Sequence, residues 1–253
     1  MLQVPGYTIN ETIHNGNRSL VFRATRENDQ KPVILKTVTH TSNNLRDLSR
    51  YQYAYDLMNS LDVQGISRPY DILEVDKKPV LVMEDIGGHS LETLIKQTKV
   101  PLAKALKLAI HWADVLGKLH HEQIIHKDIK PANFIVNESM EKMQLIDFDL
   151  STRLTKEMPE LLAANKLQGT LSYISPEQTG RMNCAIDHRT DLYSLGVSLY
   201  ELFTGKLPFP EQDPLALIHA HIALPPIAPH ELSPDLPTPI AEIILKLLSK
   251  NPD

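Results

Sequence analysis

A chain of 253 residues is long enough for one large domain or two coupled lobes, and its apolar fraction of 42% is ordinary for a globular protein. The formal net charge of −5 provides no basic field that would draw in nucleic acid or an anionic membrane. One cysteine, Cys184, excludes an internal disulfide, and no stretch approaches the roughly 18 apolar residues of a membrane span. The N-terminus does not resemble a signal peptide, so we expect a cytoplasmic protein.

The first third of the chain is expected to consist mainly of strands. Short β-branched or alternating segments are separated by polar turns, and one stretch at 45–61 has helical spacing instead. The predicted strands cover residues 7–13, 20–24, 32–38, 70–75 and 80–85. The flexible pair Gly87 and Gly88 then predicts a boundary between a first lobe at 1–86 and a second lobe at 87–253.

The rest of the chain is expected to be mostly helical. Apolar residues alternate at spacings of four and three over 102–121, which predicts an amphipathic helix. The other predicted elements are helices within 185–204, at 213–223 and at 240–248, a hairpin at 134–136 and 143–146, and proline-rich loops at 224–239. Strands followed by helices indicate an α+β fold with a cleft where the two halves meet.

One part of the chain gathers the side chains that phosphoryl transfer needs. Residues 126–133 read HKDIKPAN, and DFD follows at 147–149. The reaction depends on holding the nucleophile and the γ-phosphate in line and on neutralising the charge that develops. Asp128 can accept the hydroxyl proton, and Lys130 can contact the γ-phosphate. The hard oxygen ligands, which suit Mg²⁺ far better than zinc, come from Asn133 and Asp147.

These motifs resemble those of the eukaryotic-type Ser/Thr protein kinase family, over essentially the whole chain. HKDIKPAN corresponds to the family's catalytic loop and DFD to its DFG motif. Two further runs, 169–177 and 191–196, resemble the family's substrate loop and the start of its central helix. The resemblance implies a bilobal fold, with a small β-rich N-lobe that carries one long helix and a larger helical C-lobe. It also implies ATP and Mg²⁺ as cofactors and a protein as substrate.

The run at 169–209 is similar to a narrower group, the N-terminal kinase domains of bacterial, especially cyanobacterial, multi-domain proteins. Those proteins join a Ser/Thr kinase to an ATP-binding regulatory module, GAF sensors and a histidine kinase. The resemblance therefore implies fused or partner signalling domains. Because the chain stops before the family's final helix, we expect it to be part of a longer protein, which leaves Glu177 without its usual arginine partner.

The resemblance also implies which residues hold the nucleotide. Lys36 falls where the family's strand lysine pairs the α- and β-phosphates, and Gly16 lies in the turn that covers the phosphates. The residues expected around the adenine are Val21, Ile34 and Ile135, with Met83 as gatekeeper and the backbone of Glu84 to Ile86 as hinge.

Several positions that would help to hold ATP carry unexpected residues. The three glycine positions of the phosphate-covering turn hold His14, Gly16 and Ser19. The helix position that should supply a glutamate to Lys36 holds Ala54, and Asp149 replaces the glycine of DFG. We therefore expect Asp147 to orient Lys36, with Asp149 as a second carboxylate nearby. If this loss weakens the domain, Ala54→Glu is expected to restore a helix partner and to raise phosphotransfer, whereas in a pseudokinase it would at most tighten ATP binding. If an active wild type is unchanged by the substitution, Asp56 or another acid would be the partner of Lys36.

Two functions remain open. The first is an active but atypical Ser/Thr kinase, which is favoured because the catalytic-loop and metal positions Asp128, Lys130, Asn133 and Asp147 are all retained. Lys130 together with Thr170 favours serine or threonine, and not tyrosine, as the acceptor. A pseudokinase, meaning a nucleotide-binding regulatory or scaffolding domain, is favoured by the loss of the Lys36 partner. A fold that binds no nucleotide is a third, more distant alternative.

Other polar residues are expected to have structural or minor roles. Asp191 is expected to anchor the backbone near the catalytic loop. The predicted packing residues are His126 and Phe148, and the predicted solvated residues are His120 and His121. Candidate phosphorylation sites are Ser151, Thr152 and Thr155.

Overall fold

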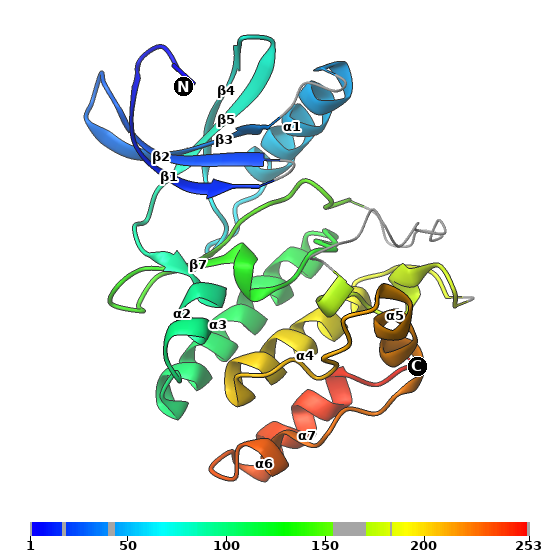
Figure 1. The fold of residues 1–253 in the computed structure, drawn as a ribbon. Coiled ribbons are helices and arrows are strands. Elements are labelled where there is room, and N and C mark those ends of the chain that lie inside the picture. The colour runs from blue at the N-terminus through cyan, green and yellow to red at the C-terminus, as the bar shows by residue number, and fades with distance from the viewer. Residues whose placement is uncertain (1, 17–18, 40–43, 154–170, 183, 252–253) are drawn as a thin grey trace. The chain divides into compact units, whose positions relative to one another are not determined.

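The structure is a computed structural model that describes residues 2–16, 19–39, 44–153, 171–182 and 184–251 (Figure 1). The chain divides into two compact units. The first contains Met1–Gly87 together with Ile146–Asp149, and the second contains Gly88–Leu145 and Leu150–Asp253. No helix among the described residues is long and apolar enough to cross a lipid bilayer.

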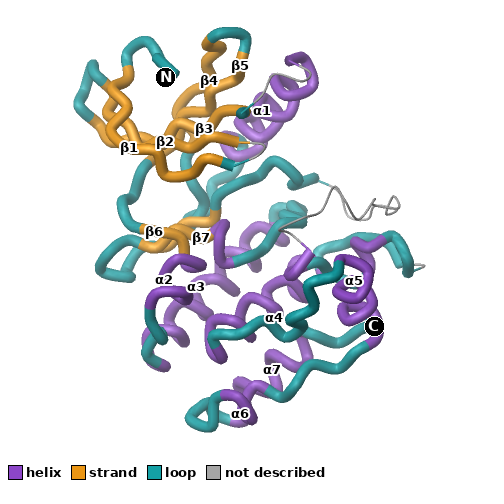
Figure 2. The backbone as a smooth tube through the Cα atoms, viewed as in Figure 1, coloured by secondary structure: helices purple, strands orange, loops and turns teal. Residues whose placement is uncertain are grey.

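The first unit is built on an antiparallel sheet of five strands in the order β1-β2-β3-β5-β4 (Figure 2). The strands are β1 (Tyr7–Asn15), β2 (Ser19–Arg26), β3 (Lys31–Val38), β4 (Pro69–Val75) and β5 (Lys78–Glu84). A charged turn at Asp76 and Lys77 joins β4 to β5, as in a hairpin. All five strands overlap the predicted ones, so this part of the fold was predicted from β-branched residues and turn signals.

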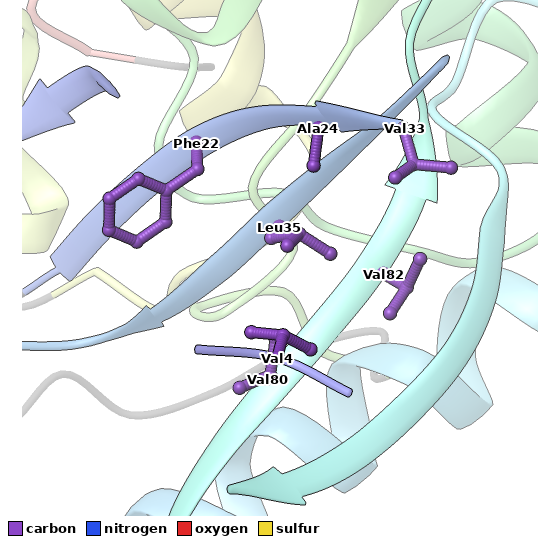
Figure 3. Close-up of a cluster of buried hydrophobic side chains, with 7 residues drawn as sticks. All are labelled: Val4, Phe22, Ala24, Val33, Leu35, Val80 and Val82. Carbon is purple, nitrogen blue, oxygen red and sulfur yellow. The ribbon is translucent and has the colours of Figure 1, made fainter. Parts of the chain in front are cut away.

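The two faces of this sheet carry different residues because side chains alternate along each strand. One face buries a cluster of apolar side chains, shown in Figure 3, that consists of Val4, Phe22, Ala24, Val33, Leu35, Val80 and Val82. The register pairs Val21 with Lys36, Ile34 with Met83 and Lys36 with Leu81, so these residues share the opposite face. Each fully buried valine or leucine contributes roughly 1.5–3 kcal/mol to folding.

Helix α1 (Asn44–Asn59) packs against β4 and β5. Its buried residues are Tyr51, Ala54, Leu57 and Met58, which recur at spacings of three and four as an amphipathic helix requires. The Tyr51 ring centroid lies 5.6 Å from the ammonium nitrogen of Lys36, so this side of α1 meets the sheet face that carries the lysine.

The second unit is mostly helical, with one small sheet in the order β6-β7-β8. Its strands are β6 (His89–Ser90), β7 (Phe134–Val136) and β8 (Met143–Leu145). Its helices are α2 (Leu91–Gln97), α3 (Leu102–His121), α4 (Arg189–Thr204), α5 (Pro214–Ala223), α6 (Pro229–Leu232) and α7 (Thr238–Leu247). Short 3₁₀ turns occur at Pro131–Asn133, Leu171–Tyr173 and Glu177–Thr179.

Helix α4 is the buried centre of this unit, since 13 of its residues are buried. A methyl group added at Gly196 of α4 would lie 2.7 Å from Cβ of Leu247, so the close contact between α4 and α7 requires glycine there. The predicted α+β class is confirmed, because a strand-rich unit and a helical unit are both present. The short elements β6, α2 and α6 were not predicted.

Candidate active site

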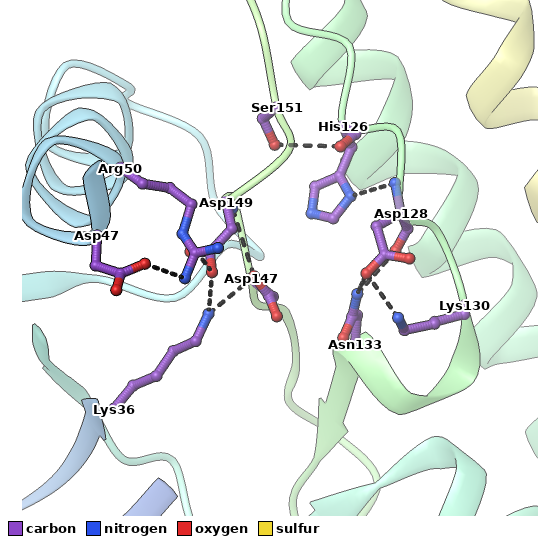
Figure 4. A network of polar contacts seen from close by, with 10 residues as sticks. All are labelled: Lys36, Asp47, Arg50, His126, Asp128, Lys130, Asn133, Asp147, Asp149 and Ser151. Atoms are coloured by element: carbon purple, nitrogen blue, oxygen red, sulfur yellow. Dashed lines mark hydrogen bonds and ion pairs between the residues drawn. The ribbon is translucent and has the colours of Figure 1, made fainter. Parts of the chain in front are cut away.

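The first group of site residues surrounds the ammonium of Lys36 inside the first unit (Figure 4). Its nitrogen lies 2.9 Å from Oδ1 of Asp147 and 2.9 Å from Oδ2 of Asp149, and its side chain is only 8% exposed. Burial alone would lower the pKa of Lys36, but the charges of the two carboxylates outweigh it and raise the pKa above its ordinary value. The prediction that Asp147 orients Lys36, with Asp149 beside it, is confirmed.

Asp149 is the more deeply buried of the two carboxylates. Burial raises its pKa, and Lys36 opposes this shift by favouring the ionised form. No acidic residue of helix α1 pairs with Lys36 among the described residues. Ala54 is fully buried, and the nearby acid Asp56 is exposed and accepts a hydrogen bond from Gln52.

The second group of site residues lies in the catalytic-loop segment of the second unit (Figure 4). Oδ2 of Asp128 accepts a hydrogen bond from Lys130 Nζ at 2.6 Å and another from Asn133 Nδ2 at 2.9 Å. The same Asn133 amide donates to the backbone carbonyl of Asp128 at 2.8 Å. Oδ1 of Asp128 is buried and has no hydrogen-bond partner among the described residues. One carboxylate oxygen is thus fixed by two side chains, and the other makes no hydrogen bond among the described residues.

The loop before Asp128 is anchored by Asp191 at the start of α4. Its two carboxylate oxygens accept the backbone N–H groups of His126 and Lys127, each at 2.8 Å, as predicted. His120 also lies 3.0 Å from Asp191 and is mostly buried, so the prediction that His120 is solvated is wrong. His126 is fully buried, in agreement with its predicted packing role.

Lys127 adopts a φ of 67°, a left-handed conformation that costs a non-glycine residue about 1–2 kcal/mol. Its N–H is held by Asp191, and its carbonyl accepts a hydrogen bond from Gln178 Nε2 at 2.9 Å. Asp147 has a similar φ of 68°. Strain of this kind is common at functional sites, where the surroundings fix it.

The residues expected around the nucleotide are placed as follows. Val21, Ile34 and Met83 lie on the Lys36 face of the first sheet. Beyond β5, Asp85 accepts hydrogen bonds from Arg23 at 2.7 Å and from the Gly87 N–H at 2.8 Å, which fixes the segment predicted as the hinge. The other candidates are Gly16, which donates to the carbonyl of Ser19, Glu84 at the end of β5, the half-buried Ile86, and Ile135 on β7 of the second unit.

The segment expected to bind substrate is described only from Leu171 onward, and Gly169, Thr170 and Thr155 lie outside the described residues. Glu177 is buried and accepts a hydrogen bond from Thr190 at 2.6 Å. Ser151 is also buried and donates to the His126 carbonyl, so in this conformation it is not exposed to a phosphate donor.

Sequence reasoning did not single out Arg50 or Gln178. Arg50 lies four residues before Ala54 on α1, and positions spaced by four share a helix face. That spacing is the signal that could have identified it. Gln178 follows the Ser-Pro-Glu run, and nothing in the sequence indicates that its amide reaches the Lys127 carbonyl.

A family model for the protein kinase domain matches residues 7–253. The chain belongs to the protein kinase family. The two units, one a β-sheet with a long helix and the other mainly helical, are those of the predicted bilobal kinase fold. Membership of this family implies ATP as the nucleotide.

Bacterial relatives support this assignment. The kinase domain is 28% identical to a probable serine/threonine-protein kinase of Clostridium acetobutylicum, over 98% of the chain and 37% of the relative. It is 33% identical to the serine/threonine-protein kinase PksC of Streptomyces coelicolor, over 76% of the chain and 33% of that protein. For the serine/threonine-protein kinase PknB of Mycolicibacterium smegmatis, the identity is 29% over 98% of the chain and 40% of the relative. The chain therefore spans about a third to two fifths of the length of these proteins.

Proposed function

We propose that the chain is an ATP-dependent Ser/Thr protein kinase domain that transfers the γ-phosphate to a protein hydroxyl in bacterial signalling. The observation that carries the proposal is the hydrogen bonding of the Asp128 carboxylate. Lys130 and Asn133 hold one of its oxygens, and the other is buried without a partner among the described residues. A carboxylate oriented in this way suits the acceptance of a hydroxyl proton.

The other catalytic roles follow from the chemistry of the side chains. Lys130 would contact the γ-phosphate, and Lys36 would pair the α- and β-phosphates. Asn133 and Asp147 would hold Mg²⁺, which neutralises phosphate charge when it is bound. The donor set fits this ion, because Asn133 donates to Asp128 twice through its amide nitrogen, and neither of these hydrogen bonds engages its side-chain carbonyl oxygen.

The nucleotide positions belong to the same proposal. We place the two lobes at 1–86 and 87–253 and assign phosphate, adenine and hinge contacts to Gly16, Val21, Ile34, Met83, Glu84, Ile86 and Ile135. The absence of any Mg²⁺-dependent binding of ATP at millimolar concentration in a calorimeter would refute this assignment.

The proposed activity is tested by transfer of radiolabel from ATP to casein, followed by analysis of the phosphoamino acids. We expect label on serine and threonine. Label found mainly on tyrosine would refute the Ser/Thr assignment, and the absence of transfer from folded protein that binds Mg·ATP would refute the kinase activity.

A pseudokinase is the second candidate, and one observation favours it. Lys36 is held by two carboxylates, of which Asp149 stands at the position of a glycine in the family's motif. On this account the domain binds Mg·ATP in the calorimeter but transfers no phosphate to casein or to itself. Removal of the Asp149 charge by Asp149→Asn would then change ATP affinity without producing transfer.

The wider context is also a proposal. The similarity of 169–209 to bacterial multi-domain kinases supports a longer, cytoplasmic protein with fused or partner signalling domains. An antibody raised against residues 1–253 should detect a product well above the size of this chain in the soluble fraction of the source cells. A product of the chain's own size would contradict this proposal.

A further inference from the structure

The starting point is the charge that helix α1 presents toward Lys36. Arg50 lies one helical turn before the buried Ala54, on the same face of α1. Its Nε is 3.8 Å from Oδ2 of Asp149, which is the oxygen that accepts the hydrogen bond from Lys36. The residue of α1 that contacts Asp149 is therefore a cation, and no carboxylate of α1 pairs with Lys36 among the described residues (Figure 4).

Asp149 lies between two cations that come from different elements. Lys36 belongs to β3 and Arg50 to α1, and both approach the same carboxylate oxygen. The Tyr51 ring lies beside both of them, with its centroid 5.6 Å from Lys36 Nζ and 5.6 Å from Arg50 Cζ. Nε of Arg50 is buried and has no hydrogen-bond partner among the described residues, and the two carboxylates within 4 Å of the guanidinium are Asp149 and Asp47.

The flanking acids complete the arrangement. Asp47, one turn earlier on α1, lies 3.8 Å from Arg50. The Asp149 N–H points to Oδ1 of Asp147 at 3.4 Å, which keeps the two carboxylates on the same side of their segment. Asp149 is half-buried, and loss of its charge would leave Lys36 with Asp147 and Arg50 with Asp47 as their carboxylate partners among the described residues.

We propose that Asp149 is a positioning residue for Lys36 and that Arg50 couples helix α1 to the lysine through it. The inference rests on the proposed nucleotide role of Lys36. A carboxylate at position 54 of α1 would hold Lys36 directly. In this chain the bridge Arg50–Asp149–Lys36 takes that role, and the helix contributes a positive charge in place of a negative one. Any movement of α1 that separates Arg50 from Asp149 weakens the hold on Lys36.

The test compares steady-state kinetics of transfer from ATP to casein in the wild type, Asp149→Asn, Arg50→Met and the double variant. We expect Asp149→Asn to raise the KM for ATP and to lower kcat/KM for ATP about tenfold, which corresponds to ~1.4 kcal/mol. Arg50→Met should lower kcat/KM for ATP about threefold, and Arg50→Lys should keep most of the wild-type kcat/KM. The double variant should be no worse than Asp149→Asn, because both changes break one bridge.

The matched control is Arg26→Met, which removes an arginine of the same unit from a surface pair with Asp29. It should leave the KM for ATP unchanged. A variant that merely loses folded protein would lower kcat and leave the KM for ATP as it was, so the two effects are separable. Thermal unfolding of each variant checks this directly.

Three results would overturn the proposal: an unchanged KM for ATP in Asp149→Asn, a faster reaction in that variant, or fully additive losses in the double variant. A faster reaction would mean that Asp149 withholds Lys36 from the nucleotide. If the wild type transfers no phosphate, the proposed activity fails and calorimetry decides the inference. Asp149→Asn and Arg50→Met should then weaken the binding of Mg·ATP and leave that of adenosine, which lacks phosphates, unchanged.

Discussion

Single residues carry most of the chemistry of this domain, and Lys36 shows the cost of burying a charge. An ammonium removed from water is stable only when opposite charges and hydrogen bonds replace its hydration. Two carboxylates at 2.9 Å supply both and keep Lys36 charged. The same two carboxylates also change what a substitution at position 54 is expected to do.

Ala54→Glu is now expected to lower stability, in contrast to the gain expected from the sequence. Ala54 is fully buried, and Lys36 already has two anionic partners, so a third carboxylate would be buried beside like charges. We expect the free energy of unfolding to fall by roughly 2–4 kcal/mol with no rise in transfer.

Urea unfolding and the casein assay measure both effects, and Ala54→Gln serves as the control of equal size without charge. The expectation is wrong if Ala54→Glu accelerates transfer while Ala54→Gln does not. In that case the missing helix carboxylate limits the activity.

Gln178 is expected to support the strained backbone at Lys127. Gln178→Glu keeps an oxygen for the Ser175 N–H but places a second oxygen against the Lys127 carbonyl. Loss of this hydrogen bond should lower the free energy of unfolding by about 1 kcal/mol and lower kcat, since Asp128 is the next residue. Gln3→Glu, at an exposed position, is the control, and an unchanged kcat in Gln178→Glu would contradict this role.

The residues that could be predicted from the sequence are those whose type and spacing carry the chemistry. Asp128, Lys130, Asn133 and Asp147 stand in short motifs, and Lys36 lies near the end of a mostly buried strand. Arg50 could not be predicted in the same way, because its contact joins α1 to a segment about 100 positions later. Contacts of that kind depend on the fold and leave no local pattern.

Among the elements, the C-terminal end of α5 shows how a helix is held in the second unit. Lys250 donates to the carbonyls of Ala220 and His221, at 3.2 and 2.9 Å, which are among the last of the helix. Its nitrogen also lies 4.3 Å from the Phe209 ring centroid. A cation at this position is favourable because it meets the negative end of the helix dipole.

The same end of α5 predicts a dependence of stability on pH. His221 is fully buried, and burial, together with the charge of Lys250, lowers its pKa to about 3. Below about pH 6.5, His221 therefore binds a proton in the unfolded chain but remains neutral in the folded chain. As a result, the free energy of unfolding falls as the pH falls from about 6.5 toward 3. The loss attributable to this residue between pH 7 and pH 5 is about 2 kcal/mol.

Urea unfolding at the two pH values measures this loss, with His221→Gln as the variant that cannot titrate. The variant should lose about 2 kcal/mol less than the wild type between pH 7 and pH 5. Equal losses in the two proteins would show that His221 is protonated in the folded state or does not contribute.

Elements were predicted best where they are long and regular. The bounds of α3 agree with the predicted 102–121, because its apolar stripe extends over five turns. Helix α2 has seven residues and α6 has four, too few for a periodic pattern to be recognised. Helix α6 begins at Pro229 within a proline-rich stretch that indicated a loop, although proline is tolerated in the first turn of a helix.

At the scale of the whole molecule, the charges proposed for catalysis are divided between the two units. Lys36, Asp147 and Asp149 are held together inside the first, and Asp128, Lys130 and Asn133 inside the second. Each set is ordered by contacts within its own unit. The first set is proposed for the α- and β-phosphates and Mg²⁺, and the second for the acceptor hydroxyl, the γ-phosphate and Mg²⁺.

The central claim, that this kinase domain transfers phosphate with Asp128 as the base, is tested most directly by the Asp128→Asn variant. Transfer from ATP to casein would be measured beside the affinity for Mg·ATP and the thermal unfolding of the same preparations. The account predicts transfer by the wild type and a loss of about a hundredfold or more in the variant, with unchanged ATP affinity. Equal transfer by both proteins, or none from a folded wild type that binds Mg·ATP, would contradict it.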